Sequence, residues 1–193
     1  MSSFYTIDET ATRWMLNHGT NLDPDVKAER HPLNFAARHA SVNTINLLLE
    51  KGADPRKCIP LIHANKREDE NWKSVMQLLL DYGCDINALN NPSDYRNLRG
   101  VYPGSVLHAV AAQDLCHMIP FFLEKGADPC KKSENGYTPA GLALRCECDE
   151  AASILLDAEK SIPCHGLMNR DVTARFVRYW YGHCAMLSCN YSC

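Results

Sequence analysis

One short stretch of this chain occurs almost unchanged in two places. Residues 47–55 read LLLEKGADP, residues 121–129 read FFLEKGADP seventy-four positions later, and a looser copy, LLLDYGCD, occupies 78–85. In each copy an apolar triplet is followed by two polar residues and then by a Gly, and an Asp lies two positions after the Gly. This order is typical of a helix that buries its last turn and ends at Gly, which adopts the left-handed conformation at low steric cost. Recurrence at intervals of a few tens of residues indicates a repeat architecture.

A second pattern precedes the apolar triplets by fifteen residues. It is seen in HPLNFAA at 31–37, SVLHAVA at 105–111 and TPAGLAL at 138–144. These segments resemble the T-P-L-H-x-A opening of an ankyrin repeat, which is about 33 residues long. Pro is tolerated in a first helical turn, and small Ala and Gly residues let that helix approach its neighbours closely. The resemblance covers roughly residues 10–160. It implies an all-α ankyrin-repeat solenoid of helix–turn–helix repeats with β-hairpin fingers.

The resemblance divides the chain into three parts. We expect an N-terminal half-repeat cap at 1–29, four ankyrin repeats at 30–160 and a C-terminal helical extension at 161–193. The cap should have a polar outer face, because a terminal repeat has one neighbour. Pro120 falls within the expected second helix of the third repeat, where it costs about 3 kcal/mol unless the helix starts later or kinks. Residues 171–182 predict a helix with an aromatic face that caps the fourth repeat, binds a partner or encloses a ligand pocket.

The connections between repeats differ in length. The regular connection, before the fourth repeat, has thirteen residues and the hairpin signal Asn135-Gly136, whereas the first has eight and the second twenty-three. We name residues 87–104 of the second connection the long finger. It is either a binding element or a surface loop without a ligand. Tyr and Arg are enriched at binding hot spots, and the candidate binding residues of the long finger are Tyr95, Arg96, Arg99 and Tyr102.

The ends of the first helices provide a second candidate surface, because ankyrin proteins commonly present them on a concave face. The candidate binding residues there, in order of repeat, are Arg38, His39, Lys66, Arg67, Gln113 and Arg145. The first two repeats therefore offer a basic cluster that could receive an acidic peptide, a carboxylate or a phosphate group. The alternative is a solvated face balanced by an acidic insert, Glu68, Asp69 and Glu70.

Composition excludes several classes of function. A net charge of −3 implies no global attraction to nucleic acid or membrane, and neither is expected as a partner. The N-terminus does not read as a secretory signal, and no apolar run reaches the roughly 18 residues that span a bilayer. The ten cysteines lack disulfide-scaffold spacing, so reduced thiols and a cytoplasmic or nuclear location are expected. The cysteines and histidines of the tail match no common zinc pattern, so neither metal nor cofactor is expected.

The sequence predicts different roles for two histidines in the repeats. His108 matches the histidine of T-P-L-H, and the resemblance implies a structural role in which it hydrogen-bonds between neighbouring turns. His63 replaces an apolar residue of an inner helix. A buried, hydrogen-bonded histidine is the simpler account of His63, and a chemical role is the alternative.

Family resemblance and the absence of catalytic motifs favour binding over catalysis. We expect an intracellular adaptor that binds a protein or peptide without covalent chemistry, through its concave face and long finger. The alternative is an unusual small-molecule-binding protein or enzyme, with an acid–base pocket between the concave face, the long finger and the C-terminal helix. Its candidate catalytic residues are His63, Arg67 and Tyr102. A deep apolar pocket with convergent polar groups would favour this alternative, and an open groove would favour peptide binding.

Overall fold

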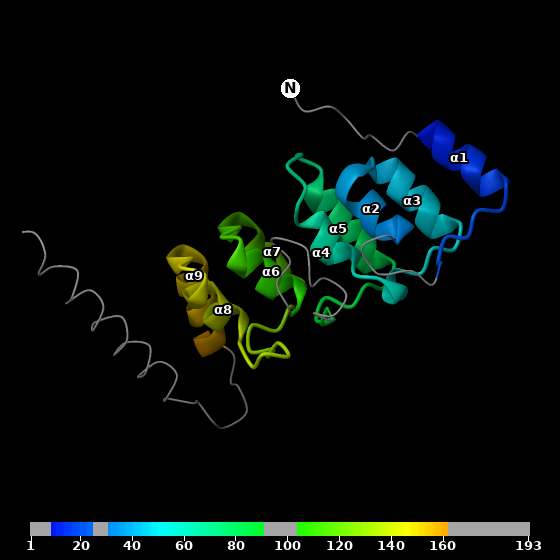
Figure 1. Cartoon of the computed structure of the whole chain (residues 1–193). Coiled ribbons are helices and arrows are strands. Elements are labelled where there is room, and N and C mark those ends of the chain that lie inside the picture. Colours follow the sequence, from blue (N-terminus) through cyan, green and yellow to red (C-terminus); the bar gives the residue numbers. More distant parts are fainter. Residues whose placement is uncertain (1–8, 25–30, 91–103, 162–193) are drawn as a thin grey trace, which may run out of the picture. The chain divides into compact units, whose positions relative to one another are not determined.

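The structure, a computed structural model, describes residues 9–24, 31–90 and 104–161. The chain divides into two units, residues 1–159 and 160–193, and the described helices belong to the first unit except for the last two residues of α9. After α1, the helices follow one another in pairs (Figure 1). They are α1 (Glu9–Asn17), α2 (Pro32–His39), α3 (Val42–Glu50), α4 (Pro60–Ala64), α5 (Trp72–Asp81), α6 (Val106–Ala112), α7 (Ile119–Glu124), α8 (Pro139–Arg145) and α9 (Asp149–Ser161).

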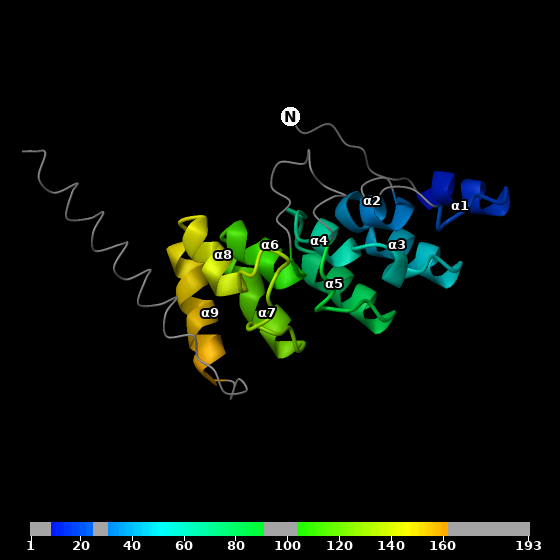
Figure 2. The ribbon, with the colours of Figure 1, turned by 60° about the horizontal axis from the view of Figure 1, so that its bottom comes forward.

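The helix pairs form two layers. Figure 2 shows the first helices, α2, α4, α6 and α8, in one row and the second helices, α3, α5, α7 and α9, in another. Within the first row α2 packs on α4 and α6 on α8, while α4 also contacts α6; in the second row α3 packs on α5. The prediction of an all-α repeat solenoid is therefore confirmed. Within the described residues, no helix combines the length and the apolar character needed to cross a membrane.

Proline and short polar side chains set where the helices begin. Pro stands at the first position of α2, α4 and α8, where its missing N–H loses no helical hydrogen bond. The hydroxyl of Ser41 accepts a 3.2 Å hydrogen bond from the N–H of Thr44 at the start of α3. The hydroxyl of Thr138 accepts one of 3.2 Å from the N–H of Gly141 at the start of α8. These caps satisfy N–H groups that have no partner within the helix.

The repeated glycine stop works as the sequence predicts. Gly52, Gly83 and Gly126 have φ of 101°, 86° and 88°, in the left-handed region that favours glycine. The N–H of the next residue returns to the last helical turn, from Ala53 to the carbonyl of Leu48 at 3.0 Å in the first repeat. The same bond recurs after α5 and α7. The second helices α3, α5 and α7 thus end in the same way, and each directs the chain into a connection.

Small residues of the first helices and large residues of the second form one hydrophobic cluster within the described part. The alanines Ala36, Ala37, Ala109, Ala111 and Ala143 are at most 1% exposed. The second helices contribute large buried side chains, Leu48, Leu79, Phe122 and Leu155. The small alanine side chains at these positions allow adjacent first helices to lie close together.

The third repeat accommodates Pro120 by starting its second helix late. A 3-10 turn over Cys116–Met118 precedes α7, which begins at Ile119. Pro120 is therefore in the first turn of α7, where no helical hydrogen bond is lost. The late start predicted as one way to avoid the proline penalty is the one that the structure adopts.

Where the structure describes the connections, they contain turns instead of the expected strands. In the regular connection the N–H of Ser133 donates to the carbonyl of Tyr137 at 2.9 Å, and the N–H of Gly136 donates to the carbonyl of Ser133 at 2.8 Å. The Asn135-Gly136 signal therefore marks a tight turn, although no strand flanks it. At the base of the long finger, Asn90 and Gly104 form an isolated antiparallel bridge.

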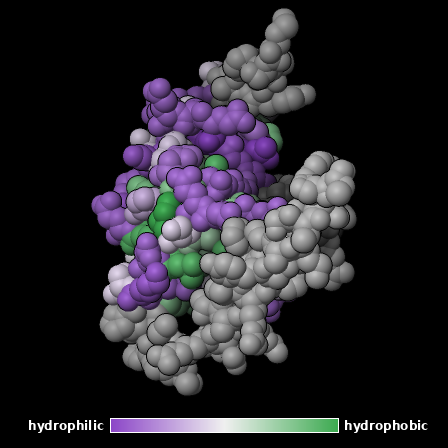
Figure 3. Space-filling model, turned by 90° about the vertical axis from the view of Figure 1, so that its left-hand side faces the viewer, coloured by the Kyte–Doolittle hydropathy of each residue, from purple (hydrophilic) through white to green (hydrophobic). Residues whose placement is uncertain are grey.

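Apolar groups are exposed at both ends of the described array. On α1 the apolar residues Trp14 and Met15 are 63% and 42% exposed and lie among exposed polar residues such as Arg13, so the exposed surface of the cap is mixed rather than wholly polar. On the side where α8 and α9 lie, Figure 3 shows a hydrophobic patch within a mostly hydrophilic surface. The helix predicted at 171–182 lies outside the described residues.

Candidate binding surface at the ends of the first helices

The end of α2 presents two exposed polar side chains. The helix starts at Pro32, and the Nδ1 atom of His31 accepts a 3.4 Å hydrogen bond from the N–H of Leu33. Arg38 and His39 occupy its last turn and are exposed. Positive charge is favourable there, since the free carbonyl groups make a helix C-terminus partially negative.

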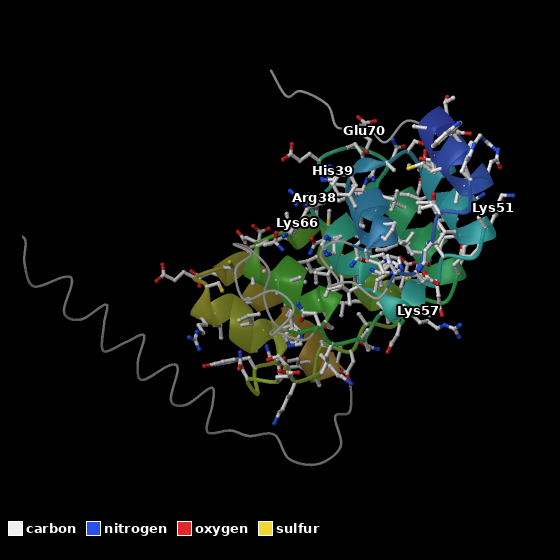
Figure 4. The ribbon with its side chains drawn as sticks, turned by 45° about the vertical axis from the view of Figure 1, so that its right-hand side comes forward. Arg38, His39, Lys51, Lys57, Lys66 and Glu70 are labelled. Carbon is white, nitrogen blue, oxygen red and sulfur yellow. The ribbon has the colours of Figure 1, made fainter. Side chains whose placement is uncertain are left out.

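The corresponding position of the second repeat adds a third basic side chain. Lys66 follows the short helix α4 and is half-buried. Burial and then the charge of Arg38 lower the pKa of Lys66. Burial and then the charges of Arg38 and Arg67 lower the pKa of His39. Figure 4 shows Arg38, His39 and Lys66 along one side of the array, and we name these three residues the basic cluster.

Arg67, which the sequence places beside Lys66 in this cluster, is buried and serves the fold instead. Its Nη1 atom donates hydrogen bonds to the carbonyl oxygens of Ala37 at 3.0 Å and Ala40 at 2.9 Å, at the end of α2. Its Nε atom donates to the Oδ1 atom of Asp69 at 3.0 Å, and its Nη2 atom contacts the other carboxylate oxygen. The guanidinium therefore joins the loop after α4 to the end of α2 and is not available to a ligand.

His63 is also buried, within α4. Burial lowers the pKa of His63 to about 4, and the positive charges of Lys66 and Arg38 act in the same direction. The imidazole is therefore neutral near pH 7. A general base works best when its pKa lies near the operating pH, so this environment does not favour His63 as a catalytic base.

The third and fourth repeats engage their helix-end residues locally. The Nε2 atom of Gln113 donates a 2.8 Å hydrogen bond to the carbonyl of Ala109. Arg145 is exposed, donates a 2.6 Å hydrogen bond to the hydroxyl of Tyr137 and lies over the same ring at 5.2 Å. The concentration of positive charge at the helix ends is therefore confined to the first two repeats.

The candidate residues of the long finger, Tyr95, Arg96, Arg99 and Tyr102, lie outside the described residues. The base of the finger is well defined. The N–H of Asn90 donates to the carbonyl of Gly104 at 3.0 Å, and the N–H of Gly104 donates to the side-chain oxygen of Asn90. Gly104 has φ of 135°, and an added Cβ would lie 2.5 Å from the Cγ atom of His108. Glycine is therefore required where the finger returns to α6.

His108 has the structural role that the family resemblance implies. Its Nδ1 atom accepts a 3.1 Å hydrogen bond from the N–H of Ser105, and its Nε2 atom lies 2.9 Å from the carbonyl oxygen of Tyr137. These two contacts specify the tautomer in which Nε2 carries the proton. The imidazole thus joins the start of α6 to the connection before α8.

A pocket of about 290 Å³ lies between the short first connection and the residues after α5. Its lining includes Ile59, Ile62 and Ile86 and the thiols of Cys58 and Cys84. Burial raises the pKa of both thiols, that of Cys84 to about 12, so they are protonated and weakly nucleophilic. The described lining contains no histidine or tyrosine. The pocket is therefore distinct from the acid–base pocket proposed from the sequence.

The described cysteines are in two states. Free thiols are found at Cys58, Cys84, Cys116, Cys146 and Cys148, whereas Cys130 is disulfide-bonded. The expectation of reduced thiols is therefore correct for five of them and wrong for Cys130. Within the described ranges no three His, Cys, Asp or Glu side chains are grouped so that they could hold a metal ion.

Phe35 is a surface feature that the sequence reasoning missed. Its side chain is 44% exposed, and its ring centroid lies 4.9 Å from that of His39 one turn later. Phe35 and His63 occupy the same place in the opening pattern of their repeats, yet His63 is buried. Sequence position alone could not separate them.

Comparison with known proteins gives two informative similarities, and no family model matches this sequence. The chain is 29% identical to the B-cell lymphoma 3 protein homolog of Mus musculus over 159 residues, which cover 72% of this chain and 32% of the mouse protein. It is 30% identical to the ankyrin repeat protein nuc-2 of Neurospora crassa over 119 residues, which cover 60% of this chain and 10% of the fungal protein. The chain therefore corresponds to a third or less of the length of these relatives.

Proposed function

This chain belongs to the ankyrin-repeat family, and we propose that it is a non-covalent protein-binding module that acts as an adaptor. Its proposed binding surface consists of the helix ends of the first two repeats together with the long finger, residues 87–104. Partner binding in the cytoplasm or nucleus is part of this proposal, since five described cysteines are free thiols.

The exposed basic cluster is the observation that carries the proposal. Polar groups that serve the fold in this protein are buried and hydrogen-bonded, as His108 and Arg67 are. Arg38 and His39, in the last turn of α2, are exposed instead. Placing the positive charges of the basic cluster close together is energetically unfavourable. A binding role for the cluster would explain why the protein has this arrangement.

The alternative function, a small-molecule-binding protein or enzyme, has less support. Two of its three candidate catalytic residues, His63 and Arg67, are buried, and Arg67 is engaged with carbonyl oxygens and Asp69. The third, Tyr102, lies outside the described residues. The observed pocket, of about 290 Å³, is lined by other residues and is slightly smaller than typical ligand sites, which have volumes of roughly 300–1,000 Å³.

Site-specific photo-crosslinking in cells of the source organism tests the proposed surface. A photoreactive amino acid replaces Arg38 in one variant and Tyr95 in another, and the exposed Lys51 serves as the control position. We expect discrete protein adducts at Arg38 and Tyr95 and none of the same mass at Lys51. Adducts of equal yield at all three positions, or none at Arg38 and Tyr95, would contradict the proposed function.

A further inference from the structure

The basic cluster forms a positive surface with a defined position in the fold. Arg38, His39 and Lys66 lie along one side of the array, apart from Lys51 and Lys57 (Figure 4). We infer that the basic cluster binds a short acidic peptide segment of a partner protein. This inference rests on the proposed function, because it specifies the chemistry of the partner at the same surface.

The two cations of the cluster, Arg38 and Lys66, form no ion pair within the described residues, although the exposed Glu70 lies on the same side of the array (Figure 4). Asp69 of the acidic insert has both carboxylate oxygens in contact with Arg67. An incoming carboxylate would therefore relieve repulsion between like charges without displacing an existing ion-pair partner.

An exposed aromatic side chain adjoins the charges. Phe35 is 44% exposed and lies one helical turn before His39, with the ring centroids 4.9 Å apart. An aromatic ring beside cationic groups suits a peptide in which an apolar side chain neighbours the carboxylates, since buried aromatic contacts and arginine pairs dominate binding energy. The surface therefore fits an acidic segment that contains an apolar residue.

The extent of the positive surface favours a short peptide over a nucleic acid. Gln113 and Arg145 of the later repeats form hydrogen bonds within the chain, and the whole protein has a net charge of −3. Nucleic-acid affinity depends on the number of phosphates that a protein neutralises. Two cationic side chains, Arg38 and Lys66, with the imidazole of His39 beside them, provide few such contacts but can pair with a few carboxylates.

Fluorescence anisotropy with designed probes tests the inference on the full chain. The probes are fluorescein-labelled peptides of one length in which Leu and Phe alternate with Glu and Asp, or with Gln, or with Lys. The cluster variant carries Arg38→Glu with Lys66→Glu, and the control variant carries Lys51→Glu with Lys132→Glu. Both variants change the net charge equally, and their melting temperatures show whether each remains folded. A single-stranded DNA of matched charge is the competing ligand.

We expect the parent to bind the Glu and Asp peptide at least about tenfold more tightly than the Gln peptide, a difference of about 1.4 kcal/mol. The cluster variant should lose this preference, the control variant should retain it, and added salt should weaken it. Equal binding of the Glu and Gln peptides, equal losses in both variants, or tighter binding of DNA would overturn the inference. If the acidic peptide does not bind more tightly than the Gln peptide while crosslinking at Arg38 still captures a protein, the proposed function stands and only the acidic partner class is rejected.

Discussion

Replacing Arg67 with Ala should destabilise the protein strongly, although a basic residue after a short helix reads as a surface group. The guanidinium donates to two carbonyl oxygens at the end of α2, those of Ala37 and Ala40, and to the carboxylate of Asp69. The substitution leaves those carbonyl groups without the partner that Arg67 supplies. It also removes a positive charge from a helix C-terminus, where such charge is favourable.

The size of the effect follows from these contacts. A hydrogen bond from a charged group is worth about 1.5–3 kcal/mol, and removing one partner of a buried ion pair costs about 3–5 kcal/mol. Asp69 is 44% exposed, so water can replace part of its interaction, and we expect the lower end. Arg67→Ala should therefore lower the free energy of unfolding by about 3 kcal/mol and the melting temperature by roughly 6–12 °C for a chain of this size.

Urea unfolding and thermal melts of Arg67→Ala, Arg67→Lys and Arg38→Ala provide the measurement. Lysine keeps the charge but lacks the planar fork of donors, so Arg67→Lys should give an intermediate loss. The matched control, Arg38→Ala, removes an exposed arginine from the same region and should change stability by less than about 0.5 kcal/mol. Equal melting temperatures for Arg67→Ala and Arg38→Ala would refute the structural role of Arg67.

Three further substitutions test other parts of the structure. His63 has a folded-state pKa of about 4 against 6.5 for an unperturbed histidine. The stability that the protein gains by keeping this imidazole neutral is therefore fully present above pH 6.5 and is lost as the pH falls towards 4. Urea titrations at pH 7 and pH 4.5 should therefore show His63→Leu losing about 2–3 kcal/mol less on acidification than the parent, and equal losses would contradict the assigned pKa. Gly104→Ala should cost more than Gly83→Ala in thermal melts, because a Cβ at Gly104 would lie 2.5 Å from His108 whereas nothing lies within 4 Å at Gly83; equal melting temperatures would count against this geometry. Pro120→Ala should change stability by less than about 0.5 kcal/mol, and a gain near 3 kcal/mol would show that the proline lies in the helix interior.

The repeat signals in the sequence were sufficient to predict the helices. Gly52 and Gly126 end helices where the repeated stretch predicts, and Pro32 and Pro139 begin them. These signals are local, because each depends on the backbone preferences of one residue and its near neighbours. His108 could be assigned as well, since it is matched to a family position whose hydrogen bonds recur from repeat to repeat.

The burial of individual side chains could not be predicted in the same way, because it depends on which elements are neighbours. Phe35 and His63 share a position in the repeat pattern, but α4 lies between α2 and α6, whereas α2 is the first helix of its row in the described array. The cap contributes α1, which packs on α3 of the other row. Phe35 therefore remains exposed while His63 is enclosed and loses its positive charge.

The acidic insert shows how the fold assigns partners that charges counted along a sequence do not specify. Because Glu68, Asp69 and Glu70 directly follow Lys66 and Arg67 in the sequence, they could be expected to neutralise these basic residues. In the structure Asp69 turns to Arg67, and Arg67 is buried against the carbonyl oxygens at the end of α2. Arg67 is thereby buried and Asp69 is engaged with it, and the positive charges of Arg38 and Lys66 are left without an ion-pair partner in the described part. The contact that stabilises the junction of the first two repeats therefore also leaves Arg38 and Lys66 free of an ion pair with Asp69, as the acidic partner that we propose requires.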